Sequence, residues 1–138
     1  MLMSSVVRRN MKPSPRFVVA AASDEKAHEV SGLLEEGESL VGWYTNPVPW
    51  EREVVVFSDR AMYVRTPTGT QRIAWQEITD YELPKSKTTV DGVRVRMGDR
   101  FVFVRMAGSH GPDGKFKDAF QLTMVLQLLV NRRRGRTW

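Results

Sequence analysis

The sequence of 138 residues contains no cysteine, and this absence excludes several kinds of site. Without thiols the chain can form neither a disulfide framework nor a cysteine-based zinc site, and it has no thiolate nucleophile. No apolar run approaches the roughly 20 residues that a membrane-spanning helix requires. We therefore expect a cytoplasmic protein, with the inner face of the membrane as a peripheral alternative.

Residues that carry catalysis are also scarce. The two histidines, His28 and His110, have no acidic residue or second histidine at a notable metal-ligand spacing. The chain has no nucleotide-binding glycine loop, and its segment 107–114 (AGSHGPDG) lacks the complete Gly-x-Ser-x-Gly pattern that exposes a serine nucleophile. We expect a protein that is not an enzyme, with no metal, no cofactor and no small-molecule substrate.

Acidic side chains are missing from both ends of the chain. Residues 1–23 hold four basic side chains and residues 131–138 hold four more. The net charge of +5 arises from 21 basic and 16 acidic residues, so the stretch between the two ends has 13 basic against 16 acidic residues, a net of −3. Any attraction to phosphate therefore belongs to the ends, and the candidate polyanion-binding tail consists of Arg132, Arg133, Arg134 and Arg136.

This distribution suggests three parts. We interpret residues 1–22 as a basic, flexible leader, 23–131 as one domain and 132–138 as a basic tail. The alternative for the leader is a twin-arginine export signal, but its apolar part of about six residues is shorter than the usual ~7–15.

The domain opens and closes with helical patterns. Ser23 is an N-cap candidate for a short helix over 24–36, in which apolar residues recur at helical spacing. A longer amphipathic helix is predicted over 115–131. Its nominally polar side carries a second apolar stripe, Phe120, Met124 and Leu128, which is a candidate helix interface. We expect either the 24–36 helix or another molecule to cover this stripe.

Between these helices the periodicity changes to two, which is typical of strands. Seven strands are predicted over 38–45, 51–57, 61–66, 70–75, 78–83, 91–97 and 100–106. Gly98-Asp99 separates the last two and is a strong signal for a two-residue hairpin turn that begins with glycine. Short strands at this spacing favour an antiparallel sandwich or barrel.

Three segments carry a resemblance to a known family. LLEEGESLVGW (33–43), VVVFSDRAMYVRT (54–66) and RIAWQEITDYEL (72–83) resemble bacterial PH-like (pleckstrin-homology) and GRAM domains. The resemblance covers about residues 33–131. It implies a mainly β (α+β) fold, a seven-stranded antiparallel bent barrel capped by the C-terminal helix, with the short N-terminal helix added.

The resemblance also implies a binding module that docks lipid headgroups, peptides or proteins. Members that bind phosphoinositides use a basic cluster at the loop between the first two strands of the fold. This sequence departs from that pattern, because TNPVPWEREV (45–54) supplies only Arg52, between Glu51 and Glu53. Trp50 in the same loop can insert into a partner or a membrane interface, or fold against the neighbouring prolines.

The last predicted hairpin offers the most informative surface. A turn at Gly98-Asp99 places Arg96 opposite Phe101 and Arg94 opposite Phe103, with Arg105 further along the same face. If the valines fill the core, these residues face outward and suit anionic, aromatic or peptide ligands. The alternatives are phenylalanines that point inward, or arginines paired with glutamates of the 24–36 region.

Two functions follow from these features. The first is a non-catalytic PH-like scaffold module for protein–protein interaction or self-association. The second is a peripheral binder of anionic membrane or nucleic acid, through the basic ends and the Arg94/Arg96/Arg105 face. The sequence does not name the ligand.

Overall fold

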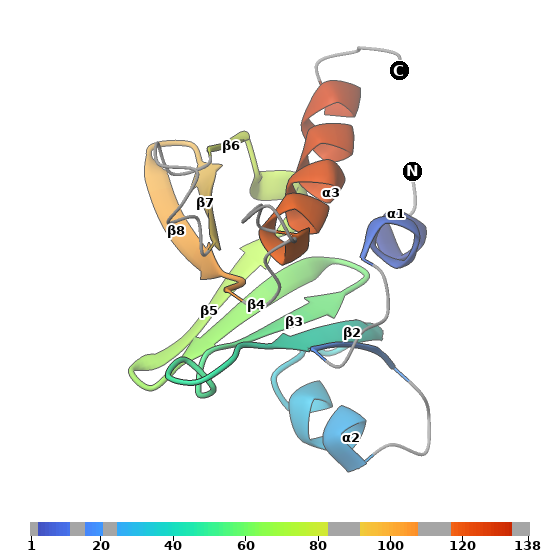
Figure 1. Cartoon of the computed structure of the whole chain (residues 1–138). Coiled ribbons are helices and arrows are strands. Elements are labelled where there is room, and N and C mark those ends of the chain that lie inside the picture. Colours follow the sequence, from blue (N-terminus) through green and yellow to red (C-terminus); the bar gives the residue numbers. More distant parts are fainter. Residues whose placement is uncertain (1–2, 12–15, 21–24, 83–91, 108–116, 134–138) are drawn as a thin grey trace.

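A computed structural model of the protein (Figure 1) describes residues 3–11, 16–20, 25–82, 92–107 and 117–133. Its helices are α1 (Met3–Asn10), α2 (Glu25–Ser31), the 3-10 helix η1 (Trp75–Glu77) and α3 (Lys117–Arg133). Its strands are β1 (Phe17–Val19), β2 (Leu40–Thr45), β3 (Val54–Ser58), β4 (Ala61–Thr66), β5 (Gly69–Ala74), β6 (Asp80–Glu82), β7 (Gly92–Met97) and β8 (Arg100–Arg105). Among the helices described, none is long and apolar enough to cross a bilayer.

The strands form two antiparallel sheets rather than one barrel. One sheet has the order β1-β2-β3-β4-β5 and the other β6-β7-β8, and no pairing between the strands that the structure describes joins them. Each of the seven predicted strands overlaps an observed strand, and the mainly β fold with a C-terminal helix is confirmed. The predicted seven-stranded bent barrel, however, is not closed. The chain leaves the first sheet through η1, where Trp75 is buried, so β5 and β6 do not form a continuous hairpin.

The five-stranded sheet is covered on both faces. Because side chains alternate along a strand, Val55 and Phe57 of β3 face the main core while Val54 and Val56 face a smaller cluster on the opposite side. All five residues of β3 are buried, which explains why this strand reads as an unbroken apolar run instead of an alternating one.

The helices divide between these faces. α2 packs on one face through Ala27 and Val30, against the cluster around Trp43, whereas α3 and the three-stranded sheet lie on the other face (Figure 1). The prediction that α2 covers the second apolar stripe of α3 is therefore wrong. Instead α1 packs against α3.

The N-terminal segment is part of the folded structure. Met3, Val6, Val7 and Met11 are buried in the main core, and β1 adds a strand to the sheet by pairing Phe17 with Tyr44. The flexible leader expected over 1–22 is thus replaced, in its described residues, by a helix and a strand. The i, i+3, i+4 spacing of the apolar residues explains the helix, and basic side chains in its last turn suit the helix dipole.

The C-terminal helix spans two more residues at its end than predicted, so Arg132 and Arg133 belong to α3. Its apolar side fills the main core, and Leu122, Val125 and Leu126 are fully buried. Tyr44 of β2 donates a hydrogen bond of 2.5 Å to the buried carboxylate of Asp118, which ties the first turn of α3 to the five-stranded sheet.

Candidate functional site

The outward face of the β7–β8 hairpin has the register that the sequence predicts. Arg96 pairs with Phe101 and Arg94 with Phe103, and Arg105 pairs with Gly92. The turn begins with Gly98 at a φ of 65°, a conformation that glycine adopts without strain. The opposite face is the buried one, formed by Val93, Val95, Met97, Val102 and Val104.

Cationic and aromatic side chains are stacked along this face. The Arg94 guanidinium lies 4.5 Å from the centre of the Phe101 ring, and that of Arg96 lies 5.7 Å from the same ring. Arg105 lies 5.2 Å from the Phe103 ring and 4.6 Å from the Trp50 ring. We call these six residues the arginine ladder. Phe101 is 45% exposed, so the alternative with phenylalanines pointing inward is wrong.

Gly92 fixes the position of one ring of the ladder. A Cβ atom at this residue would lie 2.5 Å from Cζ of Phe103 and 2.3 Å from the carbonyl oxygen of Val104. The Phe103 ring therefore occupies the space that any larger side chain at residue 92 would need. The ring packs over Gly92 and lies beneath Arg105.

Two ladder arginines have carboxylate partners within the chain. Arg94 forms an ion pair of 2.8 Å with Glu82 of β6, and Arg105 forms one of 3.0 Å with Glu53. The glutamates of the α2 region pair elsewhere, Glu29 with Arg65 and Glu35 with Arg72, so the expectation that they neutralise the ladder is wrong.

Asn46 attaches the end of the hairpin to the five-stranded sheet. Its side chain is 2% exposed and donates hydrogen bonds to the carbonyl oxygens of Glu53 and Arg105, at 2.8 and 2.9 Å. Its Oδ1 accepts a 2.8 Å bond from the backbone N–H of Ala107. The loop after β2, which carries Trp50, is thereby held against the end of β8.

The other predicted site residues are dispersed. Arg52 is exposed in the loop between β2 and β3, and Arg132 is exposed in the last turn of α3. Leu128 packs against the main core and Met124 is half-buried. The side chains of Phe120 and Arg133, together with Arg134 and Arg136, lie outside the described residues.

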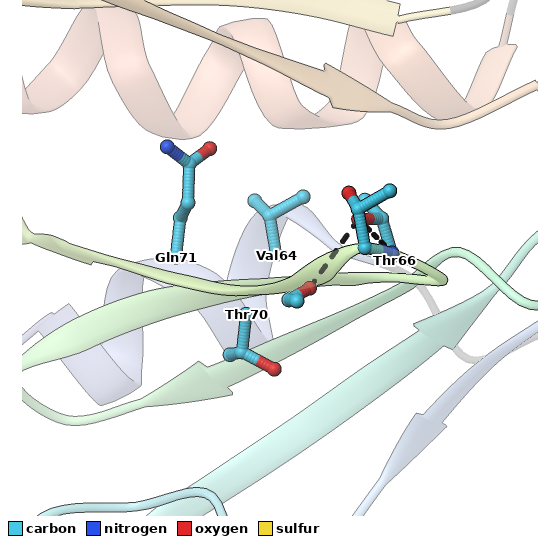
Figure 2. Close-up of a pocket in the computed structure, with 6 residues that line it drawn as sticks. Val64, Thr66, Thr70 and Gln71 are labelled. Atoms are coloured by element: carbon cyan, nitrogen blue, oxygen red, sulfur yellow. Dashed lines mark hydrogen bonds between the residues drawn. The ribbon is translucent and has the colours of Figure 1, made fainter.

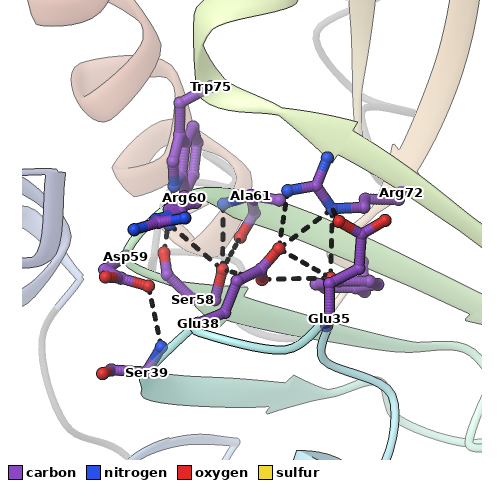
Figure 3. A network of polar contacts seen from close by, with 10 residues as sticks. Glu35, Glu38, Ser39, Ser58, Asp59, Arg60, Ala61, Arg72 and Trp75 are labelled. Carbon is purple, nitrogen blue, oxygen red and sulfur yellow. Dashed lines mark hydrogen bonds and ion pairs between the residues drawn. The ribbon is translucent and has the colours of Figure 1, made fainter.

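A second polar centre surrounds Glu38 (Figure 3). This centre was not predicted from the sequence. The Glu38 side chain is 1% exposed and accepts hydrogen bonds from Ser58 Oγ at 2.6 Å, from Tyr63 Oη at 3.0 Å and from Arg72 Nη2 at 2.6 Å. Its partners come from β3, β4 and β5, whereas Glu38 lies between α2 and β2. No local spacing connects these four residues, so the cluster has no signal in the sequence.

These contacts set the ionisation of the Glu38 network. Burial alone would raise the pKa of Glu38, but the hydrogen bonds from Ser58, Arg72 and Tyr63 outweigh it and hold that pKa below its ordinary value. The bond to Glu38 raises the pKa of Arg72 despite burial, and burial raises the pKa of Tyr63. The Glu38 carboxylate and the Arg72 guanidinium are thus both ionised across the physiological pH range. The Ser58 hydroxyl, which donates to Glu38, also accepts a 2.9 Å hydrogen bond from the backbone N–H of Ala61.

Two surface hollows accompany these centres. One of about 580 Å³ lies beside the Glu38 network and is lined by Glu35, Asp59, Arg60, Arg72, Ala74, Trp75 and Gln76. The other, of about 360 Å³, lies at the β4–β5 turn, where Val64 and Gln71 point to one side and Thr70 to the other (Figure 2). Among the described residues no three His, Asp or Glu side chains are grouped to hold a metal ion.

Comparison with known proteins identifies the fold. No protein-family model matches the chain, and no curated protein matches it. A solved DUF1696 family protein with a pleckstrin-homology domain from Shewanella loihica PV-4 aligns with a TM-score of 0.50 at 14% identity, covering 85% of this chain and 99% of that one. A pleckstrin homology domain from Shewanella amazonensis SB2B aligns with a TM-score of 0.45 at 16% identity, covering 78% and 94%. The first similarity shows that the fold is PH-like and gives no support to the GRAM-like part of the resemblance.

Proposed function

We propose that this chain is a non-catalytic PH-like binding module that recognises a protein partner through the arginine ladder. The observation that carries the proposal is the exposed stack of Arg94 and Arg96 on Phe101, continued by Arg105 between Phe103 and Trp50. Arginine and aromatic side chains are enriched at the energetic centres of protein interfaces. A PH-like fold is consistent with a binding or scaffold role.

The ladder is a better candidate than the helix stripe that the sequence suggested. Leu128 packs on the main core and α1 packs against α3, so part of that stripe is already covered within the chain. The ladder faces outward, with the Phe103 ring packed over Gly92 and the end of β8 bonded to Asn46. Side chains already placed by such contacts lose less entropy when they bind, which favours recognition.

The rival function is non-specific binding of anionic membrane or nucleic acid through the basic ends. The body between the ends carries a net charge of −3, and Glu82 and Glu53 already pair with two ladder arginines. A protein partner can place its own groups against these arginines one by one, whereas a phosphate surface attracts only by its overall charge, so the proposed order of preference is a protein first and a phosphate surface second.

The test is photo-cross-linking in the source cells. In the tested chain, the photoreactive residue benzoylphenylalanine replaces Phe101 of the ladder. The same substitution at the exposed Thr70 of β5 serves as a positional control. We expect a discrete protein adduct from residue 101 that disappears in a chain also carrying Arg94→Gln and Arg96→Gln. Arg65→Gln is the control for loss of an arginine charge away from the ladder, because Arg65 lies on the α2 side of the sheet.

A parallel titration decides the rival function. Full-length chain and a variant with Arg132, Arg133, Arg134 and Arg136 changed to glutamine are mixed with phosphatidylserine vesicles and duplex DNA at low and physiological salt. Strong binding that the variant loses, together with no ladder-dependent protein adduct, would overturn the proposal and place the function in the tail. The full chain is required here because α1 is part of the core.

A further inference from the structure

The cross-strand rows that carry the ladder arginines recur at a regular distance, which is informative about the partner. The outward rows of the hairpin are Arg96 with Phe101, Arg94 with Phe103, and Gly92 with Arg105, so each row contains one arginine. Rows that share a face are two residues apart along a strand, or about 6.6–6.8 Å. An extended polypeptide repeats its side chains on one face at the same interval.

The hydrogen bonds and ion pairs that each ladder arginine already makes indicate which chemical group of a partner it would bind. Arg94 and Arg105 each hold a carboxylate of this chain, at 2.8 and 3.0 Å. Nε of Arg96 donates to the carbonyl oxygen of Gly98 at 2.6 Å, and within the described part of the chain no carboxylate pairs with this residue. The planar guanidinium fork matches a carboxylate with two parallel hydrogen bonds.

The aromatic rings are already in contact with guanidinium groups. Phe101 lies beneath Arg94 and Arg96, and Arg105 lies over both Phe103 and Trp50. Faces covered in this way are poor platforms for stacked nucleic-acid bases, which need an open ring. The rings instead hold the guanidinium planes in place for an anionic partner.

On the basis of the proposed function, we propose that the partner segment is an extended, acidic stretch of polypeptide with carboxylates at alternate positions. Its carboxylates lie on Arg96, Arg94 and Arg105 in turn. Glu82 and Glu53 occupy two of these arginines in the free protein and act as internal competitors that the partner displaces.

Two synthetic peptides of identical composition test this inference. One carries glutamate at every second position between serines, and the other carries the same glutamates grouped at one end. Calorimetric titration into the full-length chain should show tighter binding of the alternating peptide. Arg96→Gln should weaken that binding roughly tenfold, because a charge-assisted hydrogen bond is lost.

Glu82→Gln gives the opposite and more diagnostic result. Removing the internal competitor of Arg94 should tighten binding of the alternating peptide by about two- to fivefold, as expected for an exposed ion pair. Arg65→Gln has the same charge change as Arg96→Gln and should leave binding unchanged. Circular dichroism establishes that each variant is folded before titration.

Equal affinity for the two peptides, or no change with Arg96→Gln, would overturn the inference. Weaker or unchanged binding with Glu82→Gln would overturn the displacement of internal carboxylates. If neither peptide binds but the ladder-dependent adduct from residue 101 persists, the acidic partner segment is ruled out and the proposed function stands. If the adduct is also absent, both fall.

Discussion

The Glu38 network and the arginine ladder are built from the same materials, arginines, carboxylates and aromatic rings, but they differ in burial. In the network a single carboxylate, 1% exposed, accepts hydrogen bonds from Ser58, Tyr63 and Arg72. In the ladder, Arg94 and Glu82 are each about half exposed, whereas Arg105 and Glu53 are 21% and 23% exposed, so the contrast with the network is clearest at Arg94.

The difference separates a structural role from a binding role. Breaking a buried ion pair leaves a charge without water or partner, so such a pair is costly to disturb. An exposed pair exchanges its partner for water at little cost, and can exchange it for another carboxylate equally well. The network therefore holds the fold together where α2 joins β2, while the ladder stays available for a ligand.

The largest effect is expected from Glu38→Gln. The substitution removes the charge that Arg72 faces, and places an amide N–H₂ group against the hydroxyls of Ser58 and Tyr63. We expect the free energy of unfolding to fall by roughly 3–5 kcal/mol, near the lower end because Arg72 is 29% exposed. Urea denaturation followed by fluorescence measures the change, and a loss below about 1 kcal/mol would contradict the structural role of the network.

The pH dependence of the same pair sharpens this result. Because the pKa of Glu38 is lower in the folded chain than in the unfolded one, its contribution to stability is full above the unfolded value of 4.5 and is lost as pH falls through the folded pKa. The stability difference between the parent chain and Glu38→Gln should therefore be constant near pH 7 and shrink below about pH 4. A difference that stays constant into this acid range would contradict the assignment.

Asn46→Ala should have the next largest effect. It removes a buried side chain that bonds three backbone groups, at Glu53, Arg105 and Ala107. We expect a loss of about 2–3 kcal/mol from the unsatisfied groups, and weaker binding at the ladder because the loop with Trp50 is released. Unchanged stability would show that the hairpin is held by other contacts.

Gly92→Ala changes the ladder without changing its charge. The new Cβ must displace the Phe103 ring and the Val104 carbonyl, so we expect a loss of about 1–3 kcal/mol together with weaker partner binding. The measurements are thermal unfolding and titration with the alternating peptide. A chain that keeps full affinity would show that the position of Phe103 is unimportant for binding.

Arg94→Gln should have the smallest effect on stability, below about 1 kcal/mol, because its pair with Glu82 is exposed. Cross-linking from residue 101, by contrast, should fall strongly. A stability loss comparable to that of Glu38→Gln would remove the distinction between the two regions. Thermal unfolding of the Arg94→Gln variant, measured alongside the Arg65→Gln variant, tests this prediction.

Much of the fold was predictable because its signals are local. The two-residue periodicity indicated all seven strands that follow α2, and Gly98-Asp99 fixed the register that sets Arg96 opposite Phe101. These predictions are confirmed because a strand pair joined by a two-residue turn has little freedom in register. Which face of the hairpin is buried stayed open in the sequence, and the structure places the valines in the core and the arginines outward.

Only the tertiary structure decided how distant segments meet. The sequence determined the seven strands that follow α2, the register of the last hairpin and the amphipathic C-terminal helix, since each follows from the spacing of neighbouring residues. It did not determine that α1 covers α3, that the sheets stay separate, or that Glu38 meets Ser58, Tyr63 and Arg72. Those contacts depend on which apolar faces pack together across the whole chain, and no local pattern records that choice.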